Sequence, residues 1–348
     1  ISVKPDKVRR SRGTLIWTGS ASGSVCYRKA PSGNGGSSQI RWAGWTKRRG
    51  NHEHETKAFM KATPITGALG AEISGVDLSQ ITNDQASALD DYFHQHLVLV
   101  FRDQSLDPQN LLTLTEQLGG PGDTPYLTGL PDYPDVVPII KEATEKSAVS
   151  FGSGWHTDFT FQAMPPSRTL LFAQDTPPTG GDTLFANLYT AYDGLSQGLK
   201  DLLNPLKAVH SATRSYGPKS TLGQHLENMV IHKEKTEPLE QLHPVVRYHP
   251  KTGRPALWVN PTYTIRFQGM TEIESKPLLD YLNQLIIQPS LTCRVSWAPG
   301  TLVMWDNRCT QHCATSDYHG HRRAMLRTTV AGEIPTNRDH PLSVPLEA

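Results

Sequence analysis

The apolar segments of this chain are short, and turn-forming residues close each of them. Among 348 residues there are 28 Gly and 26 Pro, and strand-like stretches such as 97–101, 168–173 and 323–330 lie between them. The sequence shows no internal repeat and no alternation of strands with helices of the kind that builds a parallel sheet. The pattern therefore predicts a mainly β fold with flanking helices, of the sandwich or jelly-roll class, and disfavours a dinucleotide-binding fold.

The other expected elements follow from hydrophobic periodicity and from capping residues. Further strands are expected at 71–78, 136–141, 183–186, 207–212, 244–248, 256–259, 292–297 and 301–305. Helices are expected at 83–94, from Asp107 and Pro108 onward, at 188–206 and at 272–287. Apart from one of these strands, residues 119–155 are irregular. A loop of that length inside a compact domain is typical of an active-site lid.

Residues 1–58 differ from the rest of the chain in composition. They are rich in Ser, Gly and Arg, and residues 1–51 hold eleven Lys or Arg but only one acid, Asp6. They show neither helical nor strand periodicity, which predicts a disordered extension. Two alternatives are an organelle transit peptide, since acids are scarce, and a non-native leader in front of a natural start at Met60. The folded domain is expected at 59–348.

The charge and cysteine content exclude several classes of protein. Beyond residue 51 the chain has 23 basic and 32 acidic residues, and this mildly acidic body argues against nucleic acid as a partner. No apolar run approaches the roughly 20 residues that span a bilayer, so no membrane segment is expected. The four cysteines form no CxxC pair and no secreted-type framework, which predicts reduced thiols in a cytoplasmic protein. A small-molecule substrate is expected, and a homo-oligomer is left open.

Three separated side chains predict a metal centre. His156 and Asp158 lie in the run Gly-Trp-His-Thr-Asp, and His312 follows near the far end of the chain. Alternation along a strand would place His156 and Asp158 on the same face. Two imidazoles and one carboxylate can occupy one face of an octahedral metal, which is the arrangement that non-haem Fe(II) oxygenases prefer because the open positions take a chelating cosubstrate and O2. Phe159 is expected in the apolar wall around these ligands.

A basic cluster follows the second histidine. Arg323 stands eleven residues after His312, and its guanidinium could hold the distal carboxylate of 2-oxoglutarate in a bidentate grip. Strand alternation places Arg323 and Arg327 on one face and Arg322 on the other. The sequence therefore predicts a cosubstrate anchor on the strand at 323–330.

Other polar residues near these motifs are assigned to the structure of the fold. Asp306 and Arg308 are expected to form an internal ion pair or to bind backbone groups. His94 and His96 lie at a predicted helix C-terminus, where an imidazole complements the helix dipole. None of these side chains needs a metal.

Four motifs in the same order resemble the taurine dioxygenase (TauD/TfdA) family: Trp155-His156-Thr157-Asp158-Phe159-Thr160-Phe161, Pro165-Pro166, Gly180-Gly181-Asp182-Thr183-Leu184 and Trp305-Asp306-Asn307-Arg308. The resemblance implies a double-stranded β-helix in which His156, Asp158 and His312 bind Fe(II). It implies that 2-oxoglutarate chelates the metal while Arg323 and the hydroxyl of Thr183 hold its distal carboxylate. It also implies that O2 is used to hydroxylate a small organic substrate, with release of succinate and CO2.

The resemblance is weaker at the substrate positions. Arg327 resembles the arginine that binds the sulfonate of taurine. Leu127 and Leu130, however, stand where taurine dioxygenase has polar residues, and Gly152 stands in place of an asparagine. We expect these four residues and Phe159 to contact the substrate. Leucine and glycine in place of polar groups favour an anion that is larger and more apolar than taurine, such as an alkyl sulfate or another sulfonate.

Two other functions fit the same residues. The first is the same chemistry on an aryloxyalkanoate or an amino-acid derivative, which Leu127 and Leu130 would also favour. The second is a non-catalytic, cupin-like metal-binding protein. A sensor needs no cosubstrate anchor, so Arg323 beside a complete set of metal ligands argues against the second, and turnover of 2-oxoglutarate would separate the two classes.

Overall fold

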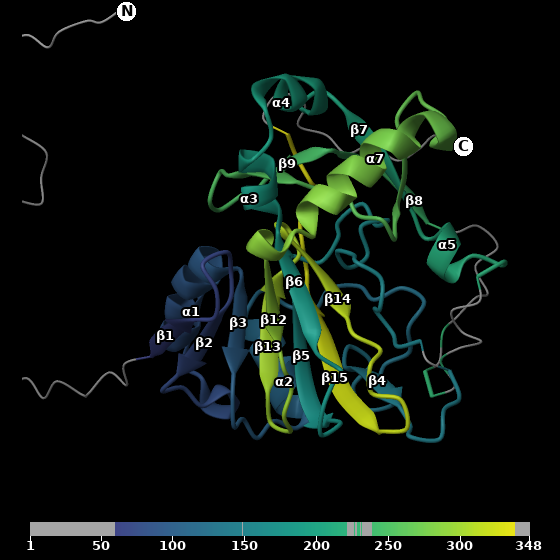
Figure 1. The fold of residues 1–348 in the computed structure, drawn as a ribbon. Coiled ribbons are helices and arrows are strands. Elements are labelled where there is room, and N and C mark those ends of the chain that lie inside the picture. Colours follow the sequence, from purple (N-terminus) through teal and green to yellow (C-terminus); the bar gives the residue numbers. More distant parts are fainter. Residues whose placement is uncertain are drawn as a thin grey trace, which may run out of the picture. The chain divides into compact units, whose positions relative to one another are not determined.

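The computed structural model describes residues 60–147, 149–220, 226, 228–229, 231 and 239–337. The extension expected at 1–58 lies outside these residues. The described elements form a mainly β architecture with helices on its sides (Figure 1). No helix in this part of the chain combines the length and the apolar character that crossing a membrane requires.

A seven-stranded sheet forms the larger wall of the fold (Figure 1). Its strand order is β1-β2-β3-β13-β5-β15-β4, and every neighbouring pair is antiparallel except β2 with β3. The bounds are Lys61–Pro64 (β1), Ala71–Ser74 (β2), Val98–Phe101 (β3), Leu302–Asp306 (β13), Arg168–Asp175 (β5), Arg323–Val330 (β15) and Val137–Lys141 (β4). From β3 to β4, strands from the first and second parts of the chain therefore alternate across this sheet.

A second, smaller sheet shares a core with the first. Its antiparallel order is β12-β6-β14, with the bounds Thr292–Val295, Thr183–Asn187 and Thr310–Ala314. Inward side chains of the large sheet, such as Val303 and Met325, are buried in one apolar cluster with Phe185 of β6. Two mainly antiparallel sheets around one core form a jelly roll, or double-stranded β-helix, which confirms the expected fold class.

Both faces of the central strands of the large sheet are buried, because helices cover the side that does not face the small sheet. The helices α1 (Asn83–His96) and α2 (Pro108–Gln117) contribute Leu89 and Leu111 to a second apolar cluster, together with Leu99 of β3. Along β3, successive side chains enter the two clusters in turn. This is why that strand is a continuous apolar run in the sequence.

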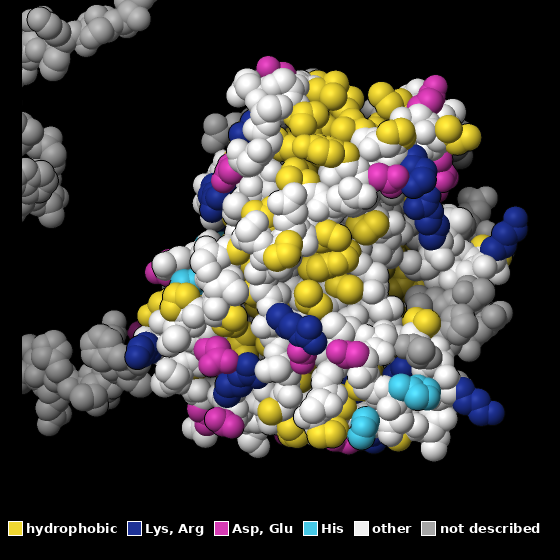
Figure 2. Space-filling view, in the orientation of Figure 1, with side chains coloured by type: hydrophobic (Ala, Val, Ile, Leu, Met, Phe, Trp, Pro, Cys, Tyr) yellow, Lys and Arg dark blue, Asp and Glu magenta, His cyan; other side chains and the backbone are white. Residues whose placement is uncertain are grey.

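The remaining strands form two small sheets in the orders β11-β7-β8 and β10-β9. Their bounds are Lys207–Ser211 (β7), Glu240–Pro244 (β8), Val246–Tyr248 (β9), Pro255–Leu257 (β10) and Thr264–Phe267 (β11). The other helices are α3 (Leu188–Asp193), α4 (Gln197–Leu203), α5 (Thr213–Tyr216) and α7 (Glu272–Ile286). Leu202 on α4 and Ile273 and Tyr281 on α7 are exposed, and apolar atoms gather over these helices in Figure 2. The homo-oligomer stays a prediction.

Several elements differ from the sequence-based expectation. The helix expected at 188–206 is divided, because Gly194 ends α3 and the side chain of Ser196 caps α4. The strand expected at 244–248 is also divided, between β8 and β9. The sequence does not predict β11 or β14. On β14 buried polar side chains such as Gln311 replace the alternation that marks a half-buried strand.

Candidate active site

The predicted metal ligands meet at the edge of the small sheet. His312 lies on β14, and the segment that carries His156 pairs with it through two backbone hydrogen bonds of 2.9 and 2.8 Å. Asp158 follows in a turn rather than on a strand, and Phe159 next to it has a φ of +48°, which is unusual for a bulky residue. The expected strand alternation is therefore wrong, yet the turn brings the carboxylate to the two imidazoles.

His156, Asp158 and His312 form a compact, buried cluster. One ligand atom from each residue lies within 4.8 Å of the others. Nε2 of His156 is 3.6 Å from Oδ1 of Asp158, and Nε2 of His312 is 3.9 Å from the same oxygen. Oδ1 of Asp158 therefore faces both imidazole nitrogens, so one divalent ion could be shared by the three side chains.

Neighbouring residues fix the orientation of these ligands. Nδ1 of His156 is 2.7 Å from the carbonyl oxygen of Gly154, so Nδ1 carries the proton and the lone pair of Nε2 faces the cluster. The hydroxyl of Thr169 donates to Oδ2 of Asp158 at 2.7 Å and accepts from Nδ2 of Asn307 at 2.8 Å. These contacts direct Oδ1 of Asp158 toward the imidazoles.

The charge states of the cluster suit a divalent metal. Burial by itself raises the pKa of Asp158, but the neighbouring His312, His156 and Arg327 outweigh burial and hold this pKa below its usual range. Burial lowers the pKa of His312 to about 3, and the nearby His156 acts in the same direction. At neutral pH the cluster therefore offers an ionised carboxylate and, in His312, a neutral imidazole, which are the forms that bind metals.

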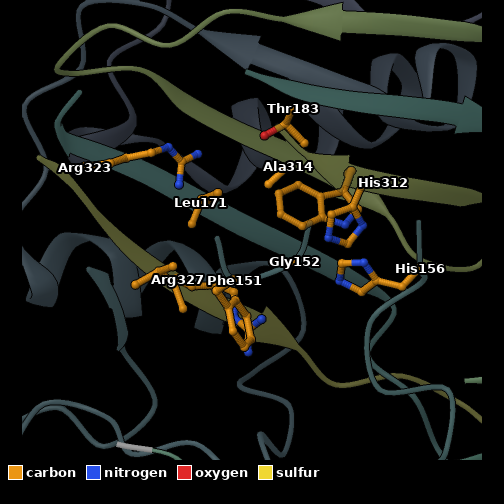
Figure 3. Close-up of a pocket in the computed structure, with 11 residues that line it drawn as sticks. Phe151, Gly152, His156, Leu171, Thr183, His312, Ala314, Arg323 and Arg327 are labelled. Carbon is orange, nitrogen blue, oxygen red and sulfur yellow. The ribbon is translucent and has the colours of Figure 1, made fainter. Parts of the chain in front are cut away.

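Arg323 and Thr183 lie at the opposite end of the same pocket (Figure 3). Arg323 is buried, and its Nε and Nη2 have no hydrogen-bond partner among the described residues. Thr183 accepts a hydrogen bond of 3.1 Å from Nε1 of Trp297, whose ring centre is 5.5 Å from the guanidinium carbon of Arg323. A buried guanidinium without acceptors is costly, so this end of the pocket is suited to an anion.

Arg327 is a second buried cation in this pocket. Its Nη1 is 3.6 Å from Oδ1 of Asp158. Its guanidinium carbon lies 4.9 Å from the ring centre of Phe159 and 5.6 Å from that of Phe151. Nε and Nη2 of Arg327 lack a hydrogen-bond partner in the part of the chain that the structure describes. This guanidinium can therefore bind an anion beside the metal-ligand cluster.

One pocket joins these groups, and its lining residues are Ile139, Phe151, Gly152, His156, Leu171, Thr183, Trp305, His312, Ala314, Arg323 and Arg327 (Figure 3). Gly152 thus lies in the pocket, where a Cβ atom would be only 3.3 Å from Cε1 of His156. Phe159 does not line the pocket but packs against Arg327. Leu127 and Leu130 line a separate depression, so the structure does not bring them to this pocket.

Three residues that support the site are absent from the sequence-based prediction. Phe151 packs against Arg327, and Thr169 and Asn307 form the hydrogen-bonded support of Asp158. Asn307 belongs to a recognised motif and could have been singled out on that ground. Thr169 lies in a buried strand where threonine is common, and Phe151 lies in an irregular segment, so neither carries a signal in the sequence.

A second group of ligand-type side chains has a structural explanation. His94, His249 and Asp306 lie within 4.8 Å of one another. Arg308 donates from Nε and Nη2 to the two carboxylate oxygens of Asp306 at 2.7 Å each, and Nε2 of His249 lies 3.1 Å from Oδ2. The expected internal ion pair is confirmed, and it occupies the carboxylate that a metal would need.

Comparisons with known proteins agree with this arrangement. The family model described as "Taurine catabolism dioxygenase TauD, TfdA family" matches residues 61–329. An alkylsulfatase from Acinetobacter baylyi is 36% identical over 280 residues, which cover 78% of this chain and 85% of the relative. An alpha-ketoglutarate-dependent sulfate ester dioxygenase from Pseudomonas putida is 32% identical over 293 residues, which cover 80% and 92%.

The fold has solved relatives as well. The crystal structure of a taurine dioxygenase from Burkholderia xenovorans matches with a TM-score of 0.70 at 30% identity, covering 83% of this chain and 95% of that chain. The sequence matches and the structural match span the same jelly-roll domain. This chain therefore belongs to the TauD/TfdA family of dioxygenases, enzymes that use Fe(II), 2-oxoglutarate and O2.

Proposed function

We propose that His156, Asp158 and His312 hold the Fe(II) of this enzyme. The donor set, two imidazoles and one carboxylate, is the one that non-haem iron oxygenases use. The hydrogen bonds from His156 to Gly154 and from Thr169 to Asp158 orient the ligands before metal arrives. Bound Fe(II) with 2-oxoglutarate would supply the activation of O2, which no side chain of the pocket can provide.

The distal carboxylate of 2-oxoglutarate is assigned to Arg323 and Thr183. Nε and Nη2 of Arg323 offer two N–H donors without competing acceptors among the described residues. Trp297 already donates to the oxygen of Thr183, so the proton of this hydroxyl is directed toward another acceptor. A carboxylate at this place would receive charge-assisted hydrogen bonds from both residues.

The observation that carries the substrate proposal is a surplus of positive charge in the pocket. Asp158 contributes one negative charge, and Arg323 and Arg327 contribute one positive charge each, which leaves +1. A divalent metal and doubly charged 2-oxoglutarate cancel each other and leave this surplus unchanged. A substrate with a single negative charge, bound on Nε and Nη2 of Arg327, brings the sum to zero, and burying unbalanced charge is unfavourable.

An alkyl sulfate ester fits this requirement best. Two relatives that match over most of their length are described as an alkylsulfatase and a sulfate ester dioxygenase. A sulfate ester carries one charge and presents oxygens to a guanidinium, while Ile139, Phe151 and Leu171 offer apolar surface to an alkyl chain. One oxygen atom of O2 would enter the C–H bond next to the ester oxygen. The hydroxylated carbon then yields an aldehyde and inorganic sulfate, while 2-oxoglutarate becomes succinate and CO2.

The test uses probes that share one chain length and differ only in the head group: hexyl sulfate, hexanesulfonate, hexanoate and hexanol. Iron-loaded enzyme receives each probe with 2-oxoglutarate and O2, and succinate and inorganic sulfate are measured. We expect hexyl sulfate to give both products in equal amounts and hexanol to give no stimulation. Equal stimulation by hexanol would contradict the charge argument. An aryloxy acid and an acyl amino acid are assayed in parallel, and stimulation by these two alone would favour the alternative substrate class.

A pair of variants, one at Arg327 on β15 and one at Arg322 just before this strand, isolates the role of Arg327. Arg327→Gln should raise the KM for hexyl sulfate about 10- to 100-fold, the loss expected for a hydrogen bond between charged groups. Arg322→Gln is the matched control, because Arg322 is exposed and pairs with Glu142 and Asp175 outside the pocket. Equal KM values for the two variants would show that the sulfate does not bind Arg327.

A further inference from the structure

Residues 149–153, here called the wall segment, form part of the pocket on the substrate side. Two of them, Phe151 and Gly152, line the pocket. The carbonyl oxygen of Gly152 accepts a backbone hydrogen bond of 2.9 Å from Ala314, and Phe151 packs against Arg327. The position of the wall segment therefore sets the space beside the guanidinium that is assigned to the sulfate.

Two buried side chains outside the proposed site hold the start of the wall segment. The hydroxyl of Ser150 donates to the hydroxyl of Tyr318 at 2.9 Å. Nζ of Lys141 donates to the carbonyl oxygen of Val149 at 3.1 Å and lies 5.2 Å from the ring centre of Tyr318. Lys141 is only 6% exposed and Tyr318 only 4%. Burying these polar groups is costly, and the wall segment supplies a hydrogen-bond partner to each.

Tyr318 also packs beside the groups assigned to 2-oxoglutarate. A Cβ atom added to Gly181 would lie 3.2 Å from Cδ1 of Tyr318 and 3.4 Å from Cδ of Arg323. Lys141 is the cross-strand partner of Arg323 in the pairing of β4 with β15, so their side chains leave the same face of the sheet. The ring of Tyr318 thus lies against Gly181, which Arg323 also flanks, while its hydroxyl binds Ser150 of the wall segment.

We propose that Tyr318 is a positioning residue, with Lys141 as its partner, that holds the wall segment in place for the sulfate ester and supports Arg323 for 2-oxoglutarate. The inference rests on the proposed function for the identity of the two ligands. The hydroxyl of Tyr318 holds the wall segment, and its ring supports Arg323. The two tasks can therefore be separated by removing one part of the side chain at a time.

The first variant, Tyr318→Phe, removes only the hydroxyl. One neutral hydrogen bond corresponds to about a 2- to 10-fold effect, and we expect amide hydrogen exchange in residues 149–153 of the metal-free protein to accelerate by this factor. The KM for hexyl sulfate should rise by a similar factor, and more succinate should form without sulfate. The Kd of 2-oxoglutarate for Mn(II)-loaded protein, measured by calorimetry, should change less than about twofold.

Two further variants test the partner residue and the ring of Tyr318, and two control variants test whether the effects are specific to this place in the fold. Lys141→Met should reproduce the exchange and KM effects of Tyr318→Phe. Tyr318→Leu should in addition weaken 2-oxoglutarate binding, because the ring that fills the space between Gly181 and its neighbour Arg323 is lost. Tyr281→Phe and Lys276→Met make the same chemical changes on α7, where these side chains are 48% and 71% exposed. Both controls should match the unmodified protein in exchange of the wall segment.

Two results would overturn the proposal. The first is unchanged exchange in residues 149–153 of Tyr318→Phe. The second is an equal weakening of 2-oxoglutarate and hexyl sulfate by that variant, which would assign the hydroxyl to Arg323 instead. If the unmodified enzyme binds neither 2-oxoglutarate nor hexyl sulfate, the proposed function fails, and the exchange measurement still decides whether Tyr318 holds the wall segment.

Discussion

Replacing Thr169 by valine tests whether the fold prepares Asp158 for a metal. Valine has nearly the same shape, so the change removes a hydroxyl and leaves the packing of β5 intact. That hydroxyl is fully buried, donates to Oδ2 of Asp158 at 2.7 Å and accepts from Nδ2 of Asn307 at 2.8 Å. In Thr169→Val, a carboxylate oxygen and an amide both lose their partner in the core.

The magnitude follows from these two losses. The hydrogen bond to the ionised carboxylate is worth about 1.5–3 kcal/mol, and the unsatisfied amide of Asn307 costs about 1–3 kcal/mol. We therefore expect the free energy of unfolding of the metal-free protein to fall by about 2.5–6 kcal/mol. Loss of a contact behind a metal ligand weakens metal binding about 10- to 100-fold, and the Kd for Fe(II) should rise by that factor. Thr169→Ser, which keeps the hydroxyl, should restore most of the affinity.

The assay combines anaerobic calorimetry with Fe(II) and urea unfolding of the metal-free protein. Thr328→Val is the matched control, because the hydroxyl of Thr328 is also buried in this sheet but lies 2.7 Å from the hydroxyl of Thr115, away from Asp158. The control should lose about 1–3 kcal/mol of stability and keep its affinity for Fe(II). Unchanged Fe(II) affinity in Thr169→Val would show that Thr169 does not prepare Asp158 for the metal. An equal loss of Fe(II) affinity in Thr169→Val and Thr328→Val would show the same.

Three further predictions concern cosubstrate binding, the core and pH. Arg323→Gln should raise the Kd of 2-oxoglutarate about 10- to 100-fold by calorimetry on Mn(II)-loaded protein, and an equal change in Arg322→Gln would contradict the assignment. Arg308→Met leaves the carboxylate of Asp306 buried without its guanidinium and should lower the free energy of unfolding in urea by about 3–5 kcal/mol; a loss below about 1 kcal/mol would show that the ion pair is not needed. Burial lowers the pKa of His243 from 6.5 to about 3, so its contribution to stability is complete above pH 6.5 and is lost as the pH falls toward 3, at up to about 1.4 kcal/mol per pH unit. His243→Gln should flatten the dependence of Tm on pH across this range, and an unchanged pH profile would show that His243 does not contribute.

Much of the fold can be predicted from the sequence because buried strands leave an apolar pattern. The strand at 323–330 is found with its bounds unchanged. Prediction failed where polar side chains are buried, as on β14, and where a cap interrupts an apolar run, as at Ser196. In these places the hydrogen-bond partners lie far away in the chain or at the helix end, and local periodicity does not report them.

The residues of the candidate site also differ in whether the local sequence indicates them. His156, Asp158 and His312 are of the residue types that a non-haem iron centre needs, and they lie within or beside motifs of the family, so the sequence indicates them before the structure brings them together. Thr169 and Tyr318 act through contacts with residues remote in sequence or on other loops, and nothing in their local sequence marks them. Leu127 and Leu130 stand at positions where the family resemblance predicts substrate contact, but they lie in a different depression.

The most direct test of the central assignment is anaerobic addition of Fe(II) and then 2-oxoglutarate, followed by visible absorption of the metal–cosubstrate chelate. We expect a charge-transfer band in the unmodified protein and none in His156→Ala or His312→Ala. In Arg323→Gln the same band should form, but only at higher 2-oxoglutarate concentration. A band of unchanged strength in both histidine variants, or no band in folded and iron-loaded protein, would contradict the assignment of the metal site.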